Sequence, residues 1–134
     1  MDNKKLVSLA SDAMRHSYSP YSHFCVGAAL LTDDGEIYTG ANLENAAYTP
    51  TVCAERVAFF KAVFDGKRSF KAIAVVGGKD GVIESFTYPC GVCRQVMREF
   101  CGGDCKIIVS DGKEIREHTL DEILPYSFGP DDLK

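Results

Sequence analysis

The hydrophobic positions of this chain follow two periods, one typical of helices and one typical of strands. Leu6, Ala10, Ala13 and Met14 recur at helical spacing and predict an amphipathic helix over residues 3–17. Apolar runs bounded by turn signals predict strands over 24–32, 36–40, 72–76, 107–109 and 114–118. Further helices are expected over 53–64, 91–101 and 120–124. Strands and helices alternate, which indicates an α/β fold around one sheet.

The segments between these elements predict a single domain spanning residues 1–134. Asp33-Asp34-Gly35 and Asp111-Gly112 are turn signals between strands, and residues 41–52 have the composition of a loop. No internal repeat or interdomain linker interrupts the pattern, and 134 residues suit one hydrophobic core. The pattern does not give the strand order.

Composition and charge narrow the range of partners. Hydrophobic residues make up 46% of the chain, the formal net charge is -4, and Lys and Arg are scattered. Proteins that bind a phosphate backbone usually carry a basic stripe, so no nucleic-acid partner is expected. No apolar run approaches the roughly 20 residues that span a bilayer, and the N-terminus does not resemble a signal peptide. We therefore expect a cytoplasmic protein that does not contact membranes.

The cysteines carry the strongest chemical signal. In a reducing cytoplasm the six cysteines are expected to bind metal or be buried rather than form disulfides. Cys90 and Cys93 have the spacing that lets two thiolates from one helical turn bind a single tetrahedral zinc, and Cys53 supplies a third thiolate. All three lie near predicted helix N-termini, where the helix dipole lowers the thiol pKa. Three protein ligands leave a fourth position for water, which is typical of catalytic zinc.

Two other interpretations of the cysteines stay open. Cys101 or Cys105 could supply a fourth thiolate and close a structural site, as in a non-enzymatic zinc-binding domain. Alternatively, Cys90 and Cys93 alone could form a thiol redox pair. Glu55 favours the catalytic interpretation, because it follows Cys53 by two residues and a structural site has no use for a carboxylate there. Cys25, Cys101 and Cys105 otherwise suit small buried positions, and His16, His23 and His118 suit surface or structural positions.

Positive charge is expected next to the three thiolates. Zinc with three thiolates carries a formal charge of about -1, which weakens its ability to acidify water. Arg56 directly follows Glu55, and Arg94 directly follows Cys93. Both are therefore predicted to donate hydrogen bonds to thiolate sulfurs, although two exposed helical arginines are the simpler alternative.

Several segments together resemble the small homotetrameric zinc-dependent cytidine deaminases. The resemblance begins with Cys53-Ala54-Glu55 and Pro89-Cys90-Gly91-Val92-Cys93, the zinc-deaminase motif. It extends to the segments 24–29, 42–48 and 124–133 and covers nearly the whole chain. Residues 49–52, which precede Cys53, depart from the usual pattern.

The resemblance implies a fold, a metal and an assembly. It implies a three-layer α/β/α domain with a five-stranded mixed sheet. It also implies one Zn²⁺ per subunit on Cys53, Cys90 and Cys93, with Glu55 as the proton shuttle. The subunits would form a homotetramer with shared active sites.

The resemblance also implies roles for residues outside the metal motif. Phe24 would pack against the pyrimidine, and Asn42 and Glu44 would hydrogen-bond the ribose. The backbone of Ala54 would meet the base edge, while Tyr48 and Phe128 would reach a neighbouring subunit's site. Each has a simpler alternative: Phe24 as core, Asn42 as a turn residue, Glu44 as a solvated charge, Tyr48 and Phe128 as aromatics packed on their own subunit.

The function implied is hydrolytic deamination of cytidine and 2'-deoxycytidine to the uridine nucleosides, a pyrimidine-salvage reaction. Water is the nucleophile, so no organic cofactor is expected. A nucleic-acid editor is disfavoured by the acidic chain. A deaminase of the blasticidin type is the closest alternative, although residues 42–48 as written here do not suit it.

Overall fold

The computed structural model describes all 134 residues and has one five-stranded sheet in the order β2-β1-β3-β4-β5. The strands are β1 (Phe24–Thr32), β2 (Ile37–Ala41), β3 (Phe70–Lys79), β4 (Lys106–Ser110) and β5 (Ile115–Thr119). β3 and β4 run parallel, and the other neighbouring pairs run antiparallel. The expected five-stranded mixed sheet in an α/β fold is confirmed.

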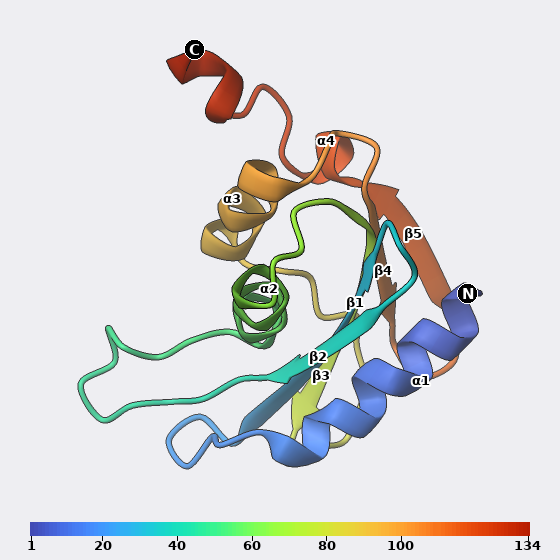
Figure 1. The fold of residues 1–134 in the computed structure, drawn as a ribbon. Coiled ribbons are helices and arrows are strands. Elements are labelled where there is room, and N and C mark those ends of the chain that lie inside the picture. The colour runs from blue at the N-terminus through green and yellow to red at the C-terminus, as the bar shows by residue number, and fades with distance from the viewer.

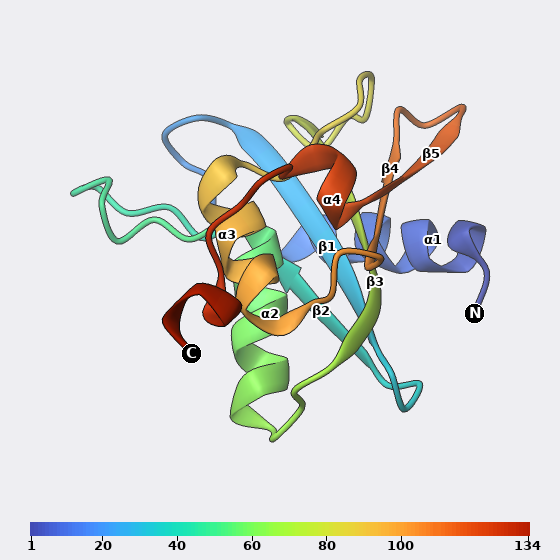
Figure 2. The same cartoon turned by 90° about the horizontal axis from the view of Figure 1, so that it is seen from above.

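Helices cover both faces of the sheet. The α-helices are α1 (Asn3–Ala13), α2 (Ala54–Phe64), α3 (Gly91–Phe100) and α4 (Leu120–Ile123). The shorter 3-10 helices are η1 (Met14–His16) and η2 (Pro130–Leu133). Figure 1 shows α1 on one face and α2 with α3 on the other, and Figure 2 shows the same layers from above. The predicted helix over 3–17 is therefore divided, with its last turn tightened into η1.

Alternating side chains of β3 supply the core on both faces. Ile73 and Val75 are fully buried in a cluster with α2 and α3, whereas Ala72, Ala74 and Val76 belong to a cluster with α1. Because successive strand residues point to opposite faces, one apolar run serves both layers. Full burial of an Ile or Val side chain contributes roughly 1.5–3 kcal/mol.

Close packing places the start of α2 against the sheet. A Cβ atom at Gly40 of β2 would overlap the carbonyl oxygen of Ala54 and lie 2.7 Å from the backbone nitrogen of Ala58. Only glycine permits this approach, because any side chain would push the helix away. The first turn of α2, which carries Glu55, is thereby held at the end of β2.

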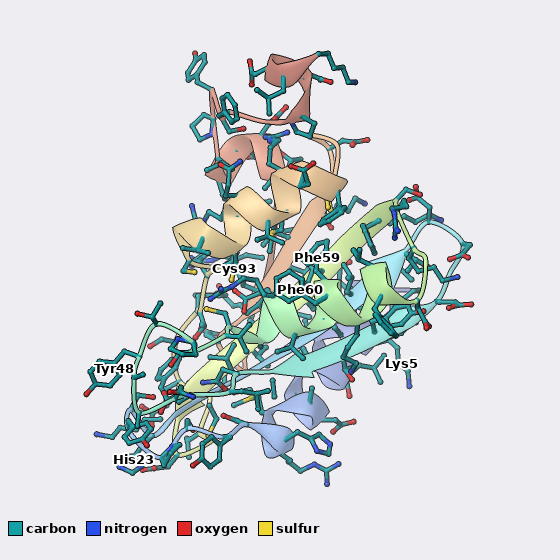
Figure 3. All side chains as sticks on the ribbon, turned by 60° about the vertical axis from the view of Figure 1, so that its left-hand side comes forward. Lys5, His23, Tyr48, Phe59, Phe60 and Cys93 are labelled. Carbon is teal, nitrogen blue, oxygen red and sulfur yellow. The ribbon has the colours of Figure 1, made fainter.

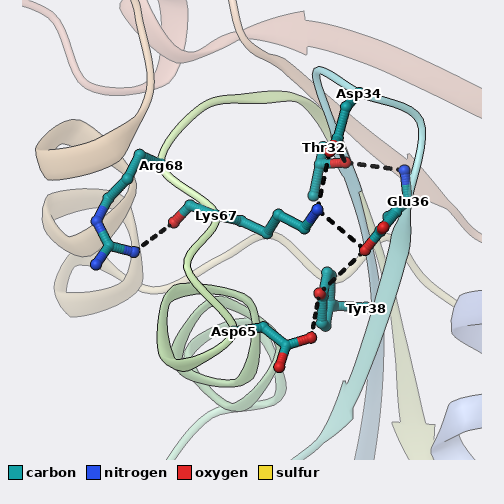
Figure 4. A network of polar contacts seen from close by, with 7 residues as sticks. All are labelled: Thr32, Asp34, Glu36, Tyr38, Asp65, Lys67 and Arg68. Carbon is teal, nitrogen blue, oxygen red and sulfur yellow. Dashed lines mark hydrogen bonds and ion pairs between the residues drawn. The ribbon is translucent and has the colours of Figure 1, made fainter.

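The other end of α2 is anchored by polar contacts to the hairpin between β1 and β2 (Figure 4). The Lys67 ammonium lies 2.8 Å from Asp34 and 3.2 Å from Glu36. The Tyr38 hydroxyl donates to Asp65 at 2.6 Å and to Glu36 at 3.2 Å. The hydrogen bond to Asp65, followed by loss of solvent contact and the hydrogen bond to Glu36, raises the pKa of Tyr38 to about 12. α2 is therefore fixed to the same hairpin at both ends.

Two segments extend away from the sheet. The loop from β2 to α2 projects at one end of the molecule, and the C-terminal segment with η2 lies beyond α3 and α4 (Figure 1). None of the helices has the length and apolar character that a membrane crossing requires.

Candidate metal centre and active site

Three cysteine thiols from two helix starts form one cluster. The Sγ atom of Cys90 lies 3.7 Å from that of Cys53 and 3.6 Å from that of Cys93, and all three lie within 4.8 Å of one another. Sulfurs bound at about 2.3 Å to a tetrahedral zinc are about 3.8 Å apart. The donor set and its spacing therefore fit zinc. In Figure 3, Cys93 lies between α3 and α2.

Local helix geometry explains why these sulfurs meet. Cys53 is the N-cap of α2 and Cys90 is the N-cap of α3, and both have extended backbone angles. Cys93 is in the first turn of α3, and its backbone N–H donates to the Sγ atom of Cys90 at 3.5 Å. An N-cap side chain lies beside the first-turn amides, so the two-residue spacing brings both sulfurs to one side of the helix start.

Hydrogen bonding within the cluster favours the thiolate of Cys53. The neighbouring Cys93 thiol and, next, the hydrogen bond from Arg56 lower the pKa of Cys53 to about 5. The neighbouring Cys53 sulfur and burial raise the pKa of the Cys93 thiol. The cluster thus favours the anionic form of the Cys53 sulfur, which is the form that binds metal.

The remaining cysteines lie outside the cluster. Cys101 ends α3 and Cys105 precedes β4, and both are buried in the core. The only group of metal-ligating side chains is the one formed by Cys53, Cys90 and Cys93. No fourth thiolate closes the site. The interpretation of a structural zinc site with Cys101 or Cys105 as the fourth ligand therefore loses its main support. Cys25 is only half-buried, contrary to the expectation of a buried position.

Glu55 is a buried carboxyl group beside the thiols. Its residue is 3% exposed in the first turn of α2. Burial raises the pKa of Glu55 to about 7, and the negative charge of Cys53 adds to the increase. A carboxyl group with a pKa near the working pH can both accept and donate a proton.

The two arginines differ in what they contact. The Nη2 atom of Arg56 donates to the Sγ atom of Cys53 at 3.4 Å, which agrees with the predicted contact. Arg94 instead donates from Nε to the carbonyl oxygen of Pro89 at 2.7 Å and from Nη1 to that of Ile123 at 2.6 Å. The predicted bond from Arg94 to a sulfur is therefore wrong. Carbonyl oxygens are stronger acceptors than thiols, and the guanidinium reaches two of them at once.

Asn42 and Glu44 both face the segment 17–26. Asn42 is 9% exposed, donates to the carbonyl oxygen of Phe24 at 2.8 Å and accepts from the Val26 amide at 2.9 Å. Glu44 accepts from the backbone amides of Tyr21 and Ser22 at 3.0 and 3.1 Å. These hydrogen bonds lower the pKa of Glu44, with the Ser22 hydroxyl making the largest contribution. Both side chains are therefore oriented before any ligand binds.

The other residues of the predicted site lie at different depths. Ala54 is fully buried at the start of α2 and Phe24 is partly exposed at the start of β1. Tyr48 is 73% exposed, and Figure 3 shows it on the projecting loop between β2 and α2. Phe128 is 59% exposed, and its carbonyl oxygen accepts from Gln95 at 2.9 Å. Neither Tyr48 nor Phe128 is packed into the core of this chain.

The unusual segment 49–52 closes the loop before Cys53. Leu43 and Val52 exchange two backbone hydrogen bonds of 3.0 Å, and the Thr51 hydroxyl accepts from the Asn45 amide at 3.0 Å. The loop thus returns to the end of β2, which places Cys53 beside the sheet.

Known proteins match the chain along its length. Residues 1–110 match the family described as the cytidine and deoxycytidylate deaminase zinc-binding region. The chain belongs to this family. A cytidine deaminase of Sporosarcina psychrophila is 51% identical over 99% of this chain and 96% of its own length. The crystal structure of a Burkholderia pseudomallei cytidine deaminase is 40% identical, with a TM-score of 0.88 over 96% of this chain and all of that chain. A Bacillus cereus blasticidin-S deaminase is 30% identical over 92% of this chain and 90% of its own length.

In this deaminase-family chain, the residues that orient Asn42 and Glu44 were not among those predicted from the sequence. The Ser17 hydroxyl donates to Asn42 at 2.5 Å, and the Ser22 hydroxyl donates to Glu44. Tyr21 and Ser22 also line a hollow of about 270 Å³ with Glu44 and Tyr48. The only signal in the sequence was the turn chemistry of residues 19–22, which does not reveal what the turn contacts.

Proposed function

We propose that this chain catalyses the hydrolytic deamination of cytidine and 2'-deoxycytidine to uridine and 2'-deoxyuridine with release of ammonia. The observation that carries the proposal is the buried carboxyl group of Glu55 beside three thiols spaced for zinc. We propose that residues 1–134 form a single catalytic domain around these groups. Reduced thiols are needed for the cluster, which supports a cytoplasmic enzyme of pyrimidine salvage.

Cys53, Cys90 and Cys93 would hold one zinc ion per chain. When bound, zinc supplies Lewis-acid chemistry that lowers the pKa of a water molecule toward neutrality. Arg56 stabilises the negative charge of the sulfurs through its contact with Cys53. The number and chemistry of the donors support this assignment.

Glu55 would move the protons of the reaction. It would take a proton from the attacking water and deliver it to ring nitrogen N3, which activates C4. After attack it would take the second proton of the former water from the hydroxyl group now on C4 and deliver it to the amine, so that the C4–N bond breaks and cytidine and water give uridine and ammonia. Its pKa of about 7 suits both acceptance and release of a proton at neutral pH.

Recognition of the sugar explains the choice of a nucleoside. Asn42 and Glu44 are already oriented beside the first residues of β1, where Phe24 is available to pack against the base. Glu44 lines the neighbouring hollow, which contains no Lys or Arg to bind a phosphate. The site therefore suits an uncharged sugar better than a nucleotide.

A comparison of five substrates tests the assignment. We expect both cytidine and deoxycytidine to be deaminated. Free cytosine should be a far poorer substrate, since polar groups that bind the sugar are then left unpaired. CMP and a short single-stranded DNA should also react poorly. The measurement is the initial rate of ultraviolet change for each at equal concentration.

The result that contradicts the nucleoside assignment is equally direct. If cytosine or the oligonucleotide reacts as efficiently as cytidine, the proposed sugar contacts are wrong. Blasticidin S serves as a sixth substrate, and a clear preference for it would favour the related deaminase activity found in the Bacillus cereus relative's name.

We also propose a homotetramer with active sites shared between subunits. Tyr48 and Phe128 support this, because both aromatic rings are largely exposed on a single chain. Phe60 and Phe64 of α2 are exposed as well. Aromatic rings on the surface of one chain are typical of interfaces.

Assembly is expected to be necessary for activity. Phe128→Ala should lower the specific activity roughly tenfold or more if the ring completes a neighbour's site, because interface aromatics often contribute about 2 kcal/mol. Val82→Ala, another exposed apolar residue, is the control and should retain activity. Sedimentation and activity measured on the same samples check the prediction. A fully active monomer would contradict it.

A further inference from the structure

The segment that leads to Cys90 is held by side chains, whereas Cys90 itself caps α3 and its carbonyl oxygen accepts from the Arg94 amide at 2.9 Å. No backbone N–H from Ile83 to Cys90 donates to a backbone carbonyl, although this segment joins β3 directly to α3. Pro89, immediately before the cysteine, has no N–H to donate. On the side that precedes the helix, the position of Cys90 therefore depends on what the side chains before it contact.

Two of those side chains are attached to the edge strand β5. The Tyr88 hydroxyl and the Nε2 atom of His118 share a hydrogen bond of 3.1 Å, and their rings meet edge to face at 5.4 Å. Next to them the Arg116 guanidinium lies 4.0 Å from the centre of the Phe86 ring. Arg116 and His118 share one face of β5, because alternate strand residues point the same way. This face of the edge strand thus contacts the segment before Cys90.

A third contact holds the segment from the side of α3. Arg94 donates to the carbonyl oxygen of Pro89 at 2.7 Å, directly between Tyr88 and Cys90. Cys90 is the exposed member of the three-thiol cluster, whereas Cys93 is buried in the core. Cys90 is consequently held by its capping contacts with α3 on one side and by these side-chain contacts on the other, with little help from burial.

We propose that Tyr88 and His118 are positioning residues for Cys90, so that the retention of zinc depends on an edge strand outside both motif segments. This inference rests on the zinc centre of the proposed function. With the Tyr88–His118 contact in place, the Cys90 thiolate stays beside the other two sulfurs. Without it, the segment samples positions in which Cys90 points away and the metal is held by two thiolates.

The rate of zinc release tests the inference. Zinc-loaded protein is mixed with an excess of a chromogenic zinc chelator in native buffer, and the absorbance increase gives the rate. Tyr88→Phe removes only the hydroxyl, and His118→Leu removes the polar ring atom. Each is expected to release zinc about tenfold faster than wild type, the lower end of the effect of residues that orient metal ligands. The double variant should be no faster than the faster single variant, because both changes remove one contact.

Two further variants separate positioning from general destabilisation. Glu117→Gln alters the opposite face of the same strand, where Glu117 contacts Asn3 and Lys106. It should release zinc at the wild-type rate. His118→Gln keeps a polar atom close to the position of Nε2 and should restore most of the retention. Urea unfolding of the metal-free proteins shows whether any variant has lost stability.

The outcomes distinguish this inference from the proposed function. If wild type retains zinc and both Tyr88→Phe and His118→Leu release it at the wild-type rate, the positioning role is wrong while the zinc centre stands. Equal acceleration in Glu117→Gln would also overturn the positioning role, because a weakened strand would then explain the effect. A wild-type chain that retains no zinc overturns the zinc centre and this inference with it.

Discussion

Replacing Glu55 by glutamine is expected to lower the turnover of cytidine by at least ~10²-fold, with up to ~10⁴-fold for a group that acts at several proton transfers. Glutamine has nearly the same shape but cannot exchange a proton, so the fold and the three thiols should be unaffected. The measurement is kcat for cytidine on protein with a determined zinc content. An unchanged zinc content alongside the lost turnover would locate the defect in proton transfer.

A matched variant controls for the chemical change itself. Glu99→Gln makes the same substitution at an exposed position of α3. It should deaminate cytidine at the wild-type rate. Turnover near wild type in zinc-loaded Glu55→Gln would rule out Glu55 as the proton shuttle and with it the proposed mechanism.

Cys93→Ser is expected to abolish stable zinc binding and, as a result, activity. Cys93 is the buried thiol of the cluster, and its loss leaves two ligands on a metal that normally takes at least three from the protein. Since changes to residues around a metal site already cost 10 to 100-fold, loss of a ligand should weaken zinc affinity by more than ~10²-fold. Zinc content after exhaustive dialysis, measured by plasma mass spectrometry, checks this.

Cys105→Ser supplies the control for burying a hydroxyl group. Cys105 is as deeply buried as Cys93 but lies outside the cluster. Both variants should therefore lose some stability, whereas only Cys93→Ser should lose zinc. If Cys93→Ser retains one equivalent of zinc, the metal is not bound by the three-cysteine cluster.

Some features of the site follow from spacing within one helix. Cys53 and Arg56 are three residues apart, so the arginine returns to the side of the helix on which the cysteine caps it. Arg94 directly follows Cys93 in the sequence, but this adjacency does not bring its guanidinium to a sulfur. Adjacent helical residues point about 100° apart, and the carbonyl oxygens that Arg94 reaches come from Pro89 and from Ile123 in a distant segment.

Strand limits show the same division. The apolar run 72–76 predicted the centre of β3, but the strand extends from Phe70 to Lys79. Beyond the predicted end at residue 76, Gly77 and Gly78 continue the strand and pair with Val26 and Cys25 of β1. A partner strand can extend a ladder through residues with little strand preference of their own, because pairing supplies the hydrogen bonds.

The sequence by itself determined the alternation of strands and helices, the mixed α/β class and the three cysteines with Glu55 as one chemical unit. These depend on local periodicity and on spacing within single turns, which a linear pattern records. Only the tertiary structure decided the strand order, the absence of a fourth thiolate, the contacts of Arg94 and the attachment of Tyr88 to His118. Each of these joins residues far apart in the chain or depends on which neighbour offers the better hydrogen-bond partner. No single segment of the sequence contains that information.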